Sequence, residues 1–189
     1  MPPATRERAL EAAVELLGAQ GVRALSHARV DERAGLPAGS TSNWFRTRRA
    51  LLGGVVDWMA ERERADFGSD GVPAQQTPEA LIDGLCAVIE LQTGPFAVRT
   101  RARYALFLEL ASDAELGEPL RRQRHEFERW TEQLVTAAGI ADPGPAARAL
   151  MALGDGLMLH RLTVDSGLDV RPVVERSVRS LMADPRQSH

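Results

Sequence analysis

Apolar residues recur at helical spacing along most of the chain. In residues 5–20, Leu10, Ala13, Val14 and Leu17 follow the i, i+3, i+4, i+7 rule that defines one face of a helix. No stretch shows the strict alternation typical of a strand, and no segment repeats. The pattern predicts an all-α fold of about nine helices. They are expected at residues 5–20, 27–34, 38–44, 48–66, 78–92, 96–111, 119–138, 143–165 and 170–182.

Capping residues and turn formers mark the ends of these helices. Ser26, Thr47 and Thr77 each precede a predicted helix, where a side-chain oxygen can accept from a free backbone N–H. Between the second and third helices, Gly35 suits a positive φ. Pro37 has its φ preset for the start of the next helix. Two short helices joined by such a corner form a helix-turn-helix, whose second helix lies in the DNA major groove.

The residues around this corner separate into an apolar and a polar set. The apolar set is expected to face inward and comprises Val30, Ala34, Leu36 and Phe45. The polar set on the third helix comprises Ser40, Thr41, Ser42 and Asn43. Taken alone, the polar set fits a solvated loop or a cluster of capping residues as well as it fits a helix that contacts DNA.

The start of the fourth helix favours the DNA-binding interpretation. Arg48 and Arg49 lie in its first turn, where cations oppose the helix dipole. Backbone N–H groups and arginines at a helix start both favour an anion, so the pair is explained if a DNA phosphate approaches.

The N-terminal quarter carries an ordered set of short motifs at residues 6–13, Leu16-Leu17, Gly21, 31–36, 39–41, Phe45 and 47–52. This set resembles the DNA-binding domain of the TetR family of transcriptional regulators. Three positions depart from the common family pattern: Pro37 replaces a frequent Ser, Ser42 a frequent Tyr, and Trp44 a frequent His or Tyr. The resemblance implies a dimer that pairs through its last two helices as a four-helix bundle.

The candidate DNA-binding residues follow from the corner and the resemblance together. Groove contacts are expected from Ser40, Thr41, Ser42 and Asn43, and backbone contacts from Trp44, Thr47, Arg48 and Arg29. Ser26 and Gly39 complete the set at the starts of the two helices. His27 is expected to be a packed or half-exposed residue rather than a base contact.

Charge is distributed unevenly along the chain. The net charge of −3 argues at first against nucleic acid. Residues 1–52 nevertheless carry +3 and residues 53–189 carry −6, as expected for a basic DNA-binding domain on an acidic body. We therefore expect a DNA-binding domain at 1–52, a connecting helix at 48–66, and an effector-binding and dimerisation domain at 53–189. The break between the bodies is expected near residues 68–73, and the Arg121–Arg124 segment is interpreted as a solvated face rather than a second nucleic-acid patch.

Several other functions lack sequence support. No phosphate-binding loop with Lys exists because the chain has no lysine, and the four histidines are scattered, so no cofactor, metal site or enzyme activity is expected. No apolar run approaches the roughly 18 residues of a membrane span, and no signal-peptide core is visible. The single cysteine, Cys86, suits a reducing cytoplasm and is expected to be buried.

The C-terminal helices predict a partner and a ligand. Residues 143–165 are apolar nearly all round, so a second subunit is the economical way to cover helices eight and nine. Residues of the fifth to eighth helices could line an effector pocket, with ordinary core packing as the alternative. The candidates are Leu85, Ile89, Arg103, Tyr104, Phe107, Phe127, Trp130, Asp155 and His160.

These patterns predict a cytoplasmic, homodimeric transcriptional regulator, in particular a ligand-responsive repressor of a palindromic operator. One alternative is a ligand-independent DNA-binding dimer. The other is a small-molecule binding module or enzyme that has a helix-turn-helix without a DNA function.

Overall fold

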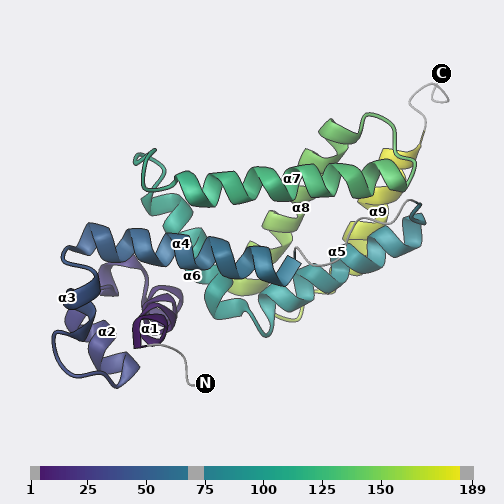
Figure 1. Cartoon of the computed structure of the whole chain (residues 1–189). Helices are drawn as coiled ribbons and strands as arrows, with labels where there is room; N and C mark the ends of the chain where they lie inside the picture. The colour runs from purple at the N-terminus through teal and green to yellow at the C-terminus, as the bar shows by residue number, and fades with distance from the viewer. Residues whose placement is uncertain (1–4, 68–74, 184–189) are drawn as a thin grey trace. The chain divides into compact units, whose positions relative to one another are not determined.

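A computed structural model of the chain describes residues 5–67 and 75–183, which are helical and contain no strand (Figure 1). The elements are α1 (Thr5–Gln20), the 3₁₀ turn η1 (Val22–Ala24), α2 (His27–Ala34), α3 (Ser40–Trp44), α4 (Arg48–Phe67), α5 (Pro78–Thr93), α6 (Ala97–Glu109), α7 (Glu118–Ala137), α8 (Pro143–Thr163) and α9 (Arg171–Met182). The predicted all-α class is confirmed.

Most predicted helix ends agree with the structure to within two residues. The side chains of Ser26, Thr47 and Thr77 accept from the N–H groups of Arg29, Ala50 and Ala80, as capping residues do. The main correction concerns α3, which begins at Ser40 and not at residue 38. Pro37 does not start the helix but accepts the Ser40 N–H in a turn at 3.1 Å.

The described chain divides into two compact units. The first contains residues 5–67 together with 97–123, and the second contains residues 75–96 together with 124–183. This grouping differs from the predicted division at residue 52, because α4, α6 and the start of α7 belong with the N-terminal helices. The predicted break at 68–73 lies outside the described residues.

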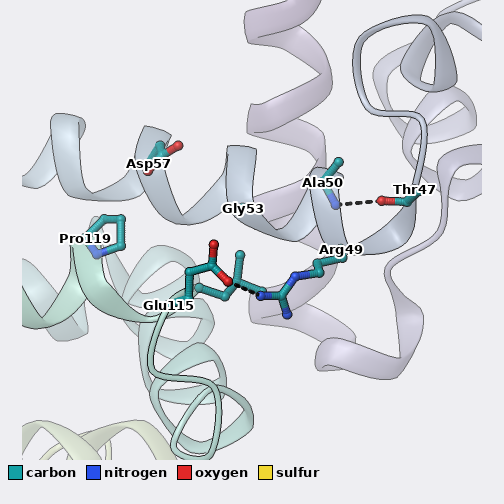
Figure 2. A pocket seen from close by; sticks show the side chains of 8 residues that line it. Thr47, Arg49, Ala50, Gly53, Asp57, Glu115 and Pro119 are labelled. Atoms are coloured by element: carbon teal, nitrogen blue, oxygen red, sulfur yellow. Dashed lines mark hydrogen bonds and ion pairs between the residues drawn. The ribbon is translucent and has the colours of Figure 1, made fainter.

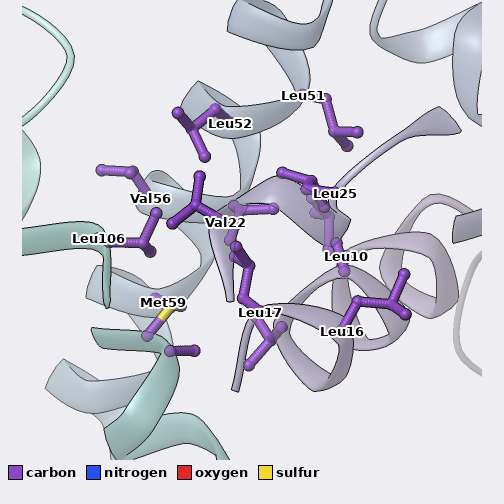
Figure 3. Close-up of a cluster of buried hydrophobic side chains, with 14 of the residues drawn as sticks. Leu10, Leu16, Leu17, Val22, Leu25, Leu51, Leu52, Val56, Met59 and Leu106 are labelled. Carbon is purple, nitrogen blue, oxygen red and sulfur yellow. The ribbon is translucent and has the colours of Figure 1, made fainter. Parts of the chain in front are cut away.

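One apolar core holds the first unit together. Figure 3 shows side chains of α1, η1, α4 and α6 converging in it. Leu10, Leu17, Leu51 and Met59 are each at most 1% exposed, so this core removes large apolar side chains from water. Val30 and Phe45 are also buried in it, as the sequence pattern predicts, and Ala34 and Leu36 pack against it.

Helices α1 and α6 approach each other closely at a glycine. A Cβ atom built on Gly18 would lie 2.0 Å from the carbonyl oxygen of Val98 and 2.7 Å from its Cγ1. Only a residue without a side chain fits there, so Gly18 is what permits α6 to pack on α1. No local pattern in the sequence predicts this contact.

The second unit has its own core of α5, α7, α8 and α9 residues. Leu81, Ile82, Val174 and Val178 are each at most 2% exposed. Cys86 is buried among them, as predicted, and burial raises the pKa of its thiol.

Among the described helices, none by itself is long and apolar enough to cross a membrane. Of these helices, only α5 and α6 taken together reach the length and composition of a span, and the two are bent by 87° where the helix is interrupted between them.

Gly18→Ala should destabilise the chain by about 1–3 kcal/mol, because the new methyl group would meet backbone that cannot move aside freely. Gly84→Ala is the matched control: Gly84 lies in α5 with nothing within 4 Å of an added Cβ, so the change should stabilise by up to about 1 kcal/mol. Urea unfolding of both variants measures the difference. Equal stability of the two variants would contradict the close approach of α1 and α6.

Candidate DNA-binding site

The corner between α2 and α3 has the geometry of a helix-turn-helix. Helix α2 ends at Gly35, which adopts the left-handed conformation with φ 61°. The N–H of Leu36 then donates to the carbonyl of Asp31 at 2.8 Å, which closes the turn. Gly39, with φ 88°, precedes the first residue of α3 and has no side chain to cap it. Both glycines occupy conformations that a larger residue would find strained.

Three side chains of α3 point to solvent. Ser42, Asn43 and Trp44 are exposed, and the indole side chain of Trp44 is among the exposed large apolar side chains. Ser40 is half-buried, and its hydroxyl donates to the carbonyl of Pro37 at 2.6 Å. The Ser42 hydroxyl donates to Gly39 in the same way, at 2.8 Å. The face available to a groove is therefore short, polar and bordered by one indole ring.

Thr41 does not belong to that face. Its side chain is fully buried, and its hydroxyl donates to Asp31 at 2.5 Å. A side chain so placed has no surface to present to a base, so the predicted groove contact by Thr41 is revised: it packs against α2 instead. The remaining predicted groove residues, Ser40, Ser42 and Asn43, keep at least part of their surface open to solvent.

Asp31 is a buried carboxylate that binds the start of α3. Its side chain accepts from the N–H of Gly39 at 2.8 Å, the N–H of Thr41 at 2.8 Å and the Thr41 hydroxyl. Burial alone would raise the pKa of Asp31, but these hydrogen bonds and the nearby His27 outweigh it, and the pKa of this carboxyl lies below its ordinary range. Asp31 is therefore ionised at neutral pH.

The predicted phosphate-binding arginines are engaged within the protein. Arg29 donates to Gln20. Arg48 donates to the carbonyls of Val22 at 2.9 Å and Leu25 at 3.4 Å, which ties the start of α4 to the segment between α1 and α2.

Thr47 and Arg46 lie between α3 and α4. The Thr47 hydroxyl accepts from the Ala50 N–H at 3.0 Å as the cap of α4. Arg46 is exposed and makes no hydrogen bond or ion pair to any residue that the structure describes. Arg46 is therefore a cation just after α3 with no partner among the described residues, and the sequence pattern did not predict it.

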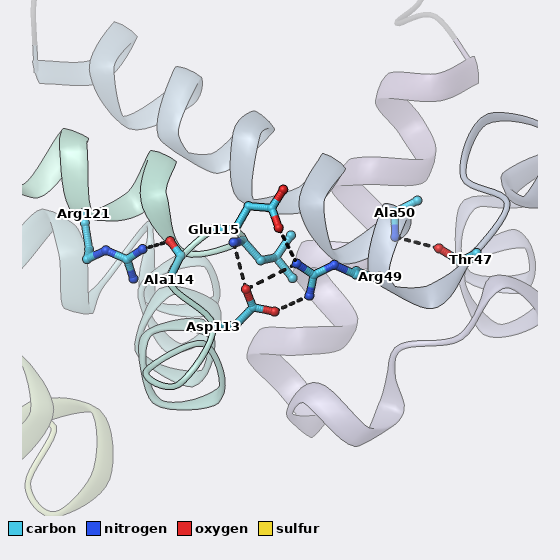
Figure 4. A network of polar contacts seen from close by, with 8 residues as sticks. Thr47, Arg49, Ala50, Asp113, Ala114, Glu115 and Arg121 are labelled. Atoms are coloured by element: carbon cyan, nitrogen blue, oxygen red, sulfur yellow. Dashed lines mark hydrogen bonds and ion pairs between the residues drawn. The ribbon is translucent and has the colours of Figure 1, made fainter.

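Arg49 is also engaged within the protein, with the loop between α6 and α7. Its guanidinium donates to Asp113, and at 3.2 Å to Glu115, in the loop between α6 and α7 (Figure 4). Hydrogen bonding to Arg49 and to the Leu116 N–H lowers the pKa of Asp113. The hydrogen bond to Asp113 in turn raises the pKa of Arg49. The structure thus explains one of the two arginines at the start of α4 by an internal ion pair.

A surface pocket of about 430 Å³ opens beside this ion pair (Figure 2). Its walls come from the start of α4 and from the α6–α7 loop, and they include Thr47, Arg49, Gly53, Asp57, Glu115, Leu116 and Pro119. None of the predicted effector-binding residues lines it.

The predicted effector-binding residues are distributed over both units. In the first unit, Arg103 donates to the buried carboxylate of Glu63 at 3.1 Å and lies 5.3 Å from the centre of the Tyr104 ring. Gln123 also donates to Glu63, at 2.9 Å. Phe107 packs against the apolar core.

In the second unit, Phe127 and Trp130 stack with ring centres 5.3 Å apart. The indole N–H of Trp130 is buried and has no acceptor among the described residues. Asp155 pairs with Arg124, Ile89 is buried, Leu85 is half-buried and His160 is exposed. His160 is therefore the least suited of these residues to line an enclosed pocket.

The described parts of the chain contain no group of three or more His, Cys, Asp or Glu side chains that could hold a metal ion.

The fold and the site define an all-helical protein with an N-terminal helix-turn-helix. A family model described as "Tetracyclin repressor-like, C-terminal domain" matches residues 76–184, more than half of the chain. The chain belongs to the TetR family of transcriptional regulators, which confirms the resemblance seen in its first quarter. A search of curated proteins gives no match.

Several solved structures have a similar fold over nearly the whole length of this chain. A member of the TetR family from Streptomyces coelicolor A3 is 27% identical, with a TM-score of 0.70 over 96% of this chain and 100% of that one. The multidrug binding protein EbrR, complexed with ethidium, is 27% identical with a TM-score of 0.65 over the same shares. A transcriptional regulator from Rhodococcus sp. Rha1 shares the fold at a TM-score of 0.75 and 18% identity, covering 94% of this chain and 96% of that chain.

Proposed function

We propose that the chain is a dimeric, cytoplasmic DNA-binding regulator that represses transcription from a palindromic operator and responds to a small molecule. The observation that supports DNA binding best is the solvent-facing side of α3. Ser42 and Asn43 point outward from a helix whose inner side is fixed to α2 by buried Asp31 and Thr41. Short polar side chains on such a helix can hydrogen-bond base edges in the major groove.

Phosphate contacts come from the residues that follow α3. Arg46 is free to bind a phosphate oxygen, and Trp44 can lie against the DNA backbone. Contacts of this kind hold the protein in register without reading sequence. Arg48 contributes mainly by holding the start of α4 against Val22 and Leu25.

A homodimer accounts for the exposed apolar residues of the last two helices. Leu159 on α8 is 50% exposed, and Val173 and Met182 on α9 are each 38% exposed. Pairing of α8 and α9 with their copies would cover these side chains. Two recognition helices would then lie roughly 34–36 Å apart, or a multiple of this, and read the two halves of a palindrome.

An effector site in the second unit would make the regulator responsive to a small molecule. The stacked pair Phe127 and Trp130 offers an aromatic wall, and the unsatisfied Trp130 N–H can donate to a ligand oxygen. EbrR, which is similar to this chain, has been crystallised with ethidium, proflavin and imidazole. A difference in ligand affinity of about 1–3 kcal/mol between two states of the protein suffices to switch DNA binding.

Arg46→Ala should weaken binding to cognate and random duplex DNA by similar factors and reduce the salt slope of log K by about one. The melting temperature should not change, since Arg46 makes no hydrogen bond or ion pair to a residue that the structure describes. Arg129→Ala, which removes an exposed arginine of α7, is the matched control and should leave both affinities unchanged. Fluorescence anisotropy at several salt concentrations measures the affinities for both duplexes and the salt slope. A loss confined to the cognate duplex would show that Arg46 reads bases.

Leu159→Arg should convert the dimer into a monomer, because a charge would be placed in the centre of the apolar pairing surface. Light scattering after size exclusion gives the mass directly. Val164→Arg is the control, since Val164 lies just beyond α8 and is 72% exposed. If the wild-type chain elutes as a monomer, or the Leu159 variant stays a dimer, pairing through α8 and α9 is wrong.

A true effector should raise the melting temperature, because it binds only the folded chain. A panel of small apolar and aromatic acids, amides and cationic dyes, ethidium included, tests this by thermal shift. Trp130→Phe keeps an aromatic ring but removes the indole N–H, and should reduce the shift given by ligands that contain a hydrogen-bond acceptor. If no compound shifts the melting temperature while DNA binding is intact, the chain is instead a ligand-independent DNA-binding dimer.

A further inference from the structure

Helix α3 is too short to determine its own position. It contains five residues, and an isolated helix needs at least about 12–15 residues to be even marginally stable in water. Its N-cap residue is Gly39, which offers no side-chain acceptor. The shape and direction of the helix that faces DNA must therefore be imposed by other parts of the fold.

Helix α2 supplies contacts to both ends of α3. At the N-terminal end, the Asp31 carboxylate accepts from two backbone N–H groups, those of Gly39 and Thr41. At the other end, Nε2 of His27 lies 2.5 Å from the carbonyl oxygen of Phe45, the residue that terminates α3. A carbonyl can only accept, so this ring nitrogen bears the proton. His27 and Asp31 are four residues apart and therefore share one face of α2.

The chemistry at each end matches what that end needs. The first N–H groups of a helix lack intrahelical partners and attract negative charge, whereas its last carbonyls need donors. Charge-assisted hydrogen bonds such as those to Asp31 are about twice as strong as neutral ones. Asp31 and Thr41 are 3% and 0% exposed, so water cannot replace either partner.

Helix α2 is itself firmly held. Val30 is fully buried in the core of the first unit. Arg33 pairs with Glu15 of α1 at 2.7 Å, and Arg8 of α1 donates to the carbonyl of Ala34 at 2.7 Å. Contacts from α2 can therefore fix α3 relative to α1.

We propose that Asp31 and His27 are positioning residues for DNA recognition: they hold the two ends of α3 so that Ser42 and Asn43 meet the groove at a fixed angle. This inference rests on the proposed DNA-binding function. Neither residue touches DNA. Asp31 has the larger effect, because it is buried and has three hydrogen bonds.

The test uses Asp31→Asn in the full chain, with Glu32→Gln as matched control. Both changes remove one negative charge from neighbouring positions of α2, but Glu32 is exposed. Electrostatics alone predicts that both variants bind DNA slightly more tightly, because each loses a repulsion from phosphate. Positioning predicts the opposite for Asp31→Asn, whose affinity should fall about 5- to 150-fold, the factor expected when a buried hydrogen-bonding group loses its partner.

The DNA probe is a duplex selected by the wild-type chain from a random-sequence library. Amide hydrogen exchange of the free protein gives a second readout that needs no DNA. The Gly39 and Thr41 amides should exchange at least about tenfold faster in Asp31→Asn than in Glu32→Gln, while amides of α1 and α8 are unchanged. Unchanged α1 and α8 amides also show that the variant is folded.

His27 is tested by rescue. His27→Ala removes the donor and should weaken binding to the selected duplex severalfold, whereas His27→Gln retains an N–H donor and should restore most of it. Failure of glutamine to do better than alanine would show that the ring acts by packing and not by its hydrogen bond.

The outcomes separate the inference from the function on which it rests. If the wild-type chain selects no duplex, the proposed DNA binding is wrong, and the exchange rates still decide whether Asp31 orders α3. If the wild type binds and Asp31→Asn binds equally well, Asp31 is not a positioning residue. Equal exchange of the Gly39 and Thr41 amides in both variants overturns the inference as well.

Discussion

One buried carboxylate, that of Asp31, holds the start of α3. Asp31 brings together two backbone N–H groups and a hydroxyl from a turn and a helix that lie eight to ten residues further along the chain. A buried charge is costly unless its hydrogen-bonding capacity is met, and here it is met by groups that would otherwise lack partners themselves. The short α3 thereby obtains a defined direction, and with it the outward placement of Ser42 and Asn43. The apolar core beneath α1, α2 and α4 provides stability, but it does not by itself orient a five-residue helix.

Polar contacts between segments that are distant in sequence also hold other parts of the first unit. Arg48 joins the start of α4 to the carbonyls of Val22 and Leu25, and Arg49 joins it to Asp113 in the α6–α7 loop. Buried Glu63 on α4 is met by Arg103 of α6 and Gln123 of α7. Helix α4 is therefore bound at both ends to other parts of its unit, which is the arrangement expected of an element that transmits a change. A shift of α6 or of the α6–α7 loop must alter the contacts of α4, and only residues 45–47 separate α4 from α3.

Local signals in the sequence were enough for the helices but not for the site. Ser26, Thr47, Thr77 and Gly35 mark helix ends through interactions within a few residues, so their roles could be predicted. The start of α3 was misplaced because its cap comes from Asp31, which is distant in sequence. Thr41 was assigned to the groove for the same reason: a short polar side chain gives no local sign that its partner is a buried carboxylate. The membership of α6 in the first unit depends on Gly18, whose missing side chain matters only once Val98 lies against it. Local sequence does not separate Arg46 from Arg48 and Arg49, because none of the three has an acidic residue three or four positions away. Arg48 and Arg49 find their partners only in the folded chain.

In the function that we propose, the exposed side of α3 enters the major groove on each half of a twofold site. Dimethyl sulfate protection tests this placement of α3 most directly, because this reagent methylates guanine N7 in the major groove. On a duplex selected by the chain, we expect two protected clusters of guanines, related by twofold symmetry and roughly 34–36 Å, or a multiple of this, apart. Replacing Asn43 with alanine should change the pattern within each cluster. A duplex that is bound tightly with every guanine N7 still reactive, or with a single unsymmetrical protected cluster, would show that α3 does not enter the major groove in this way.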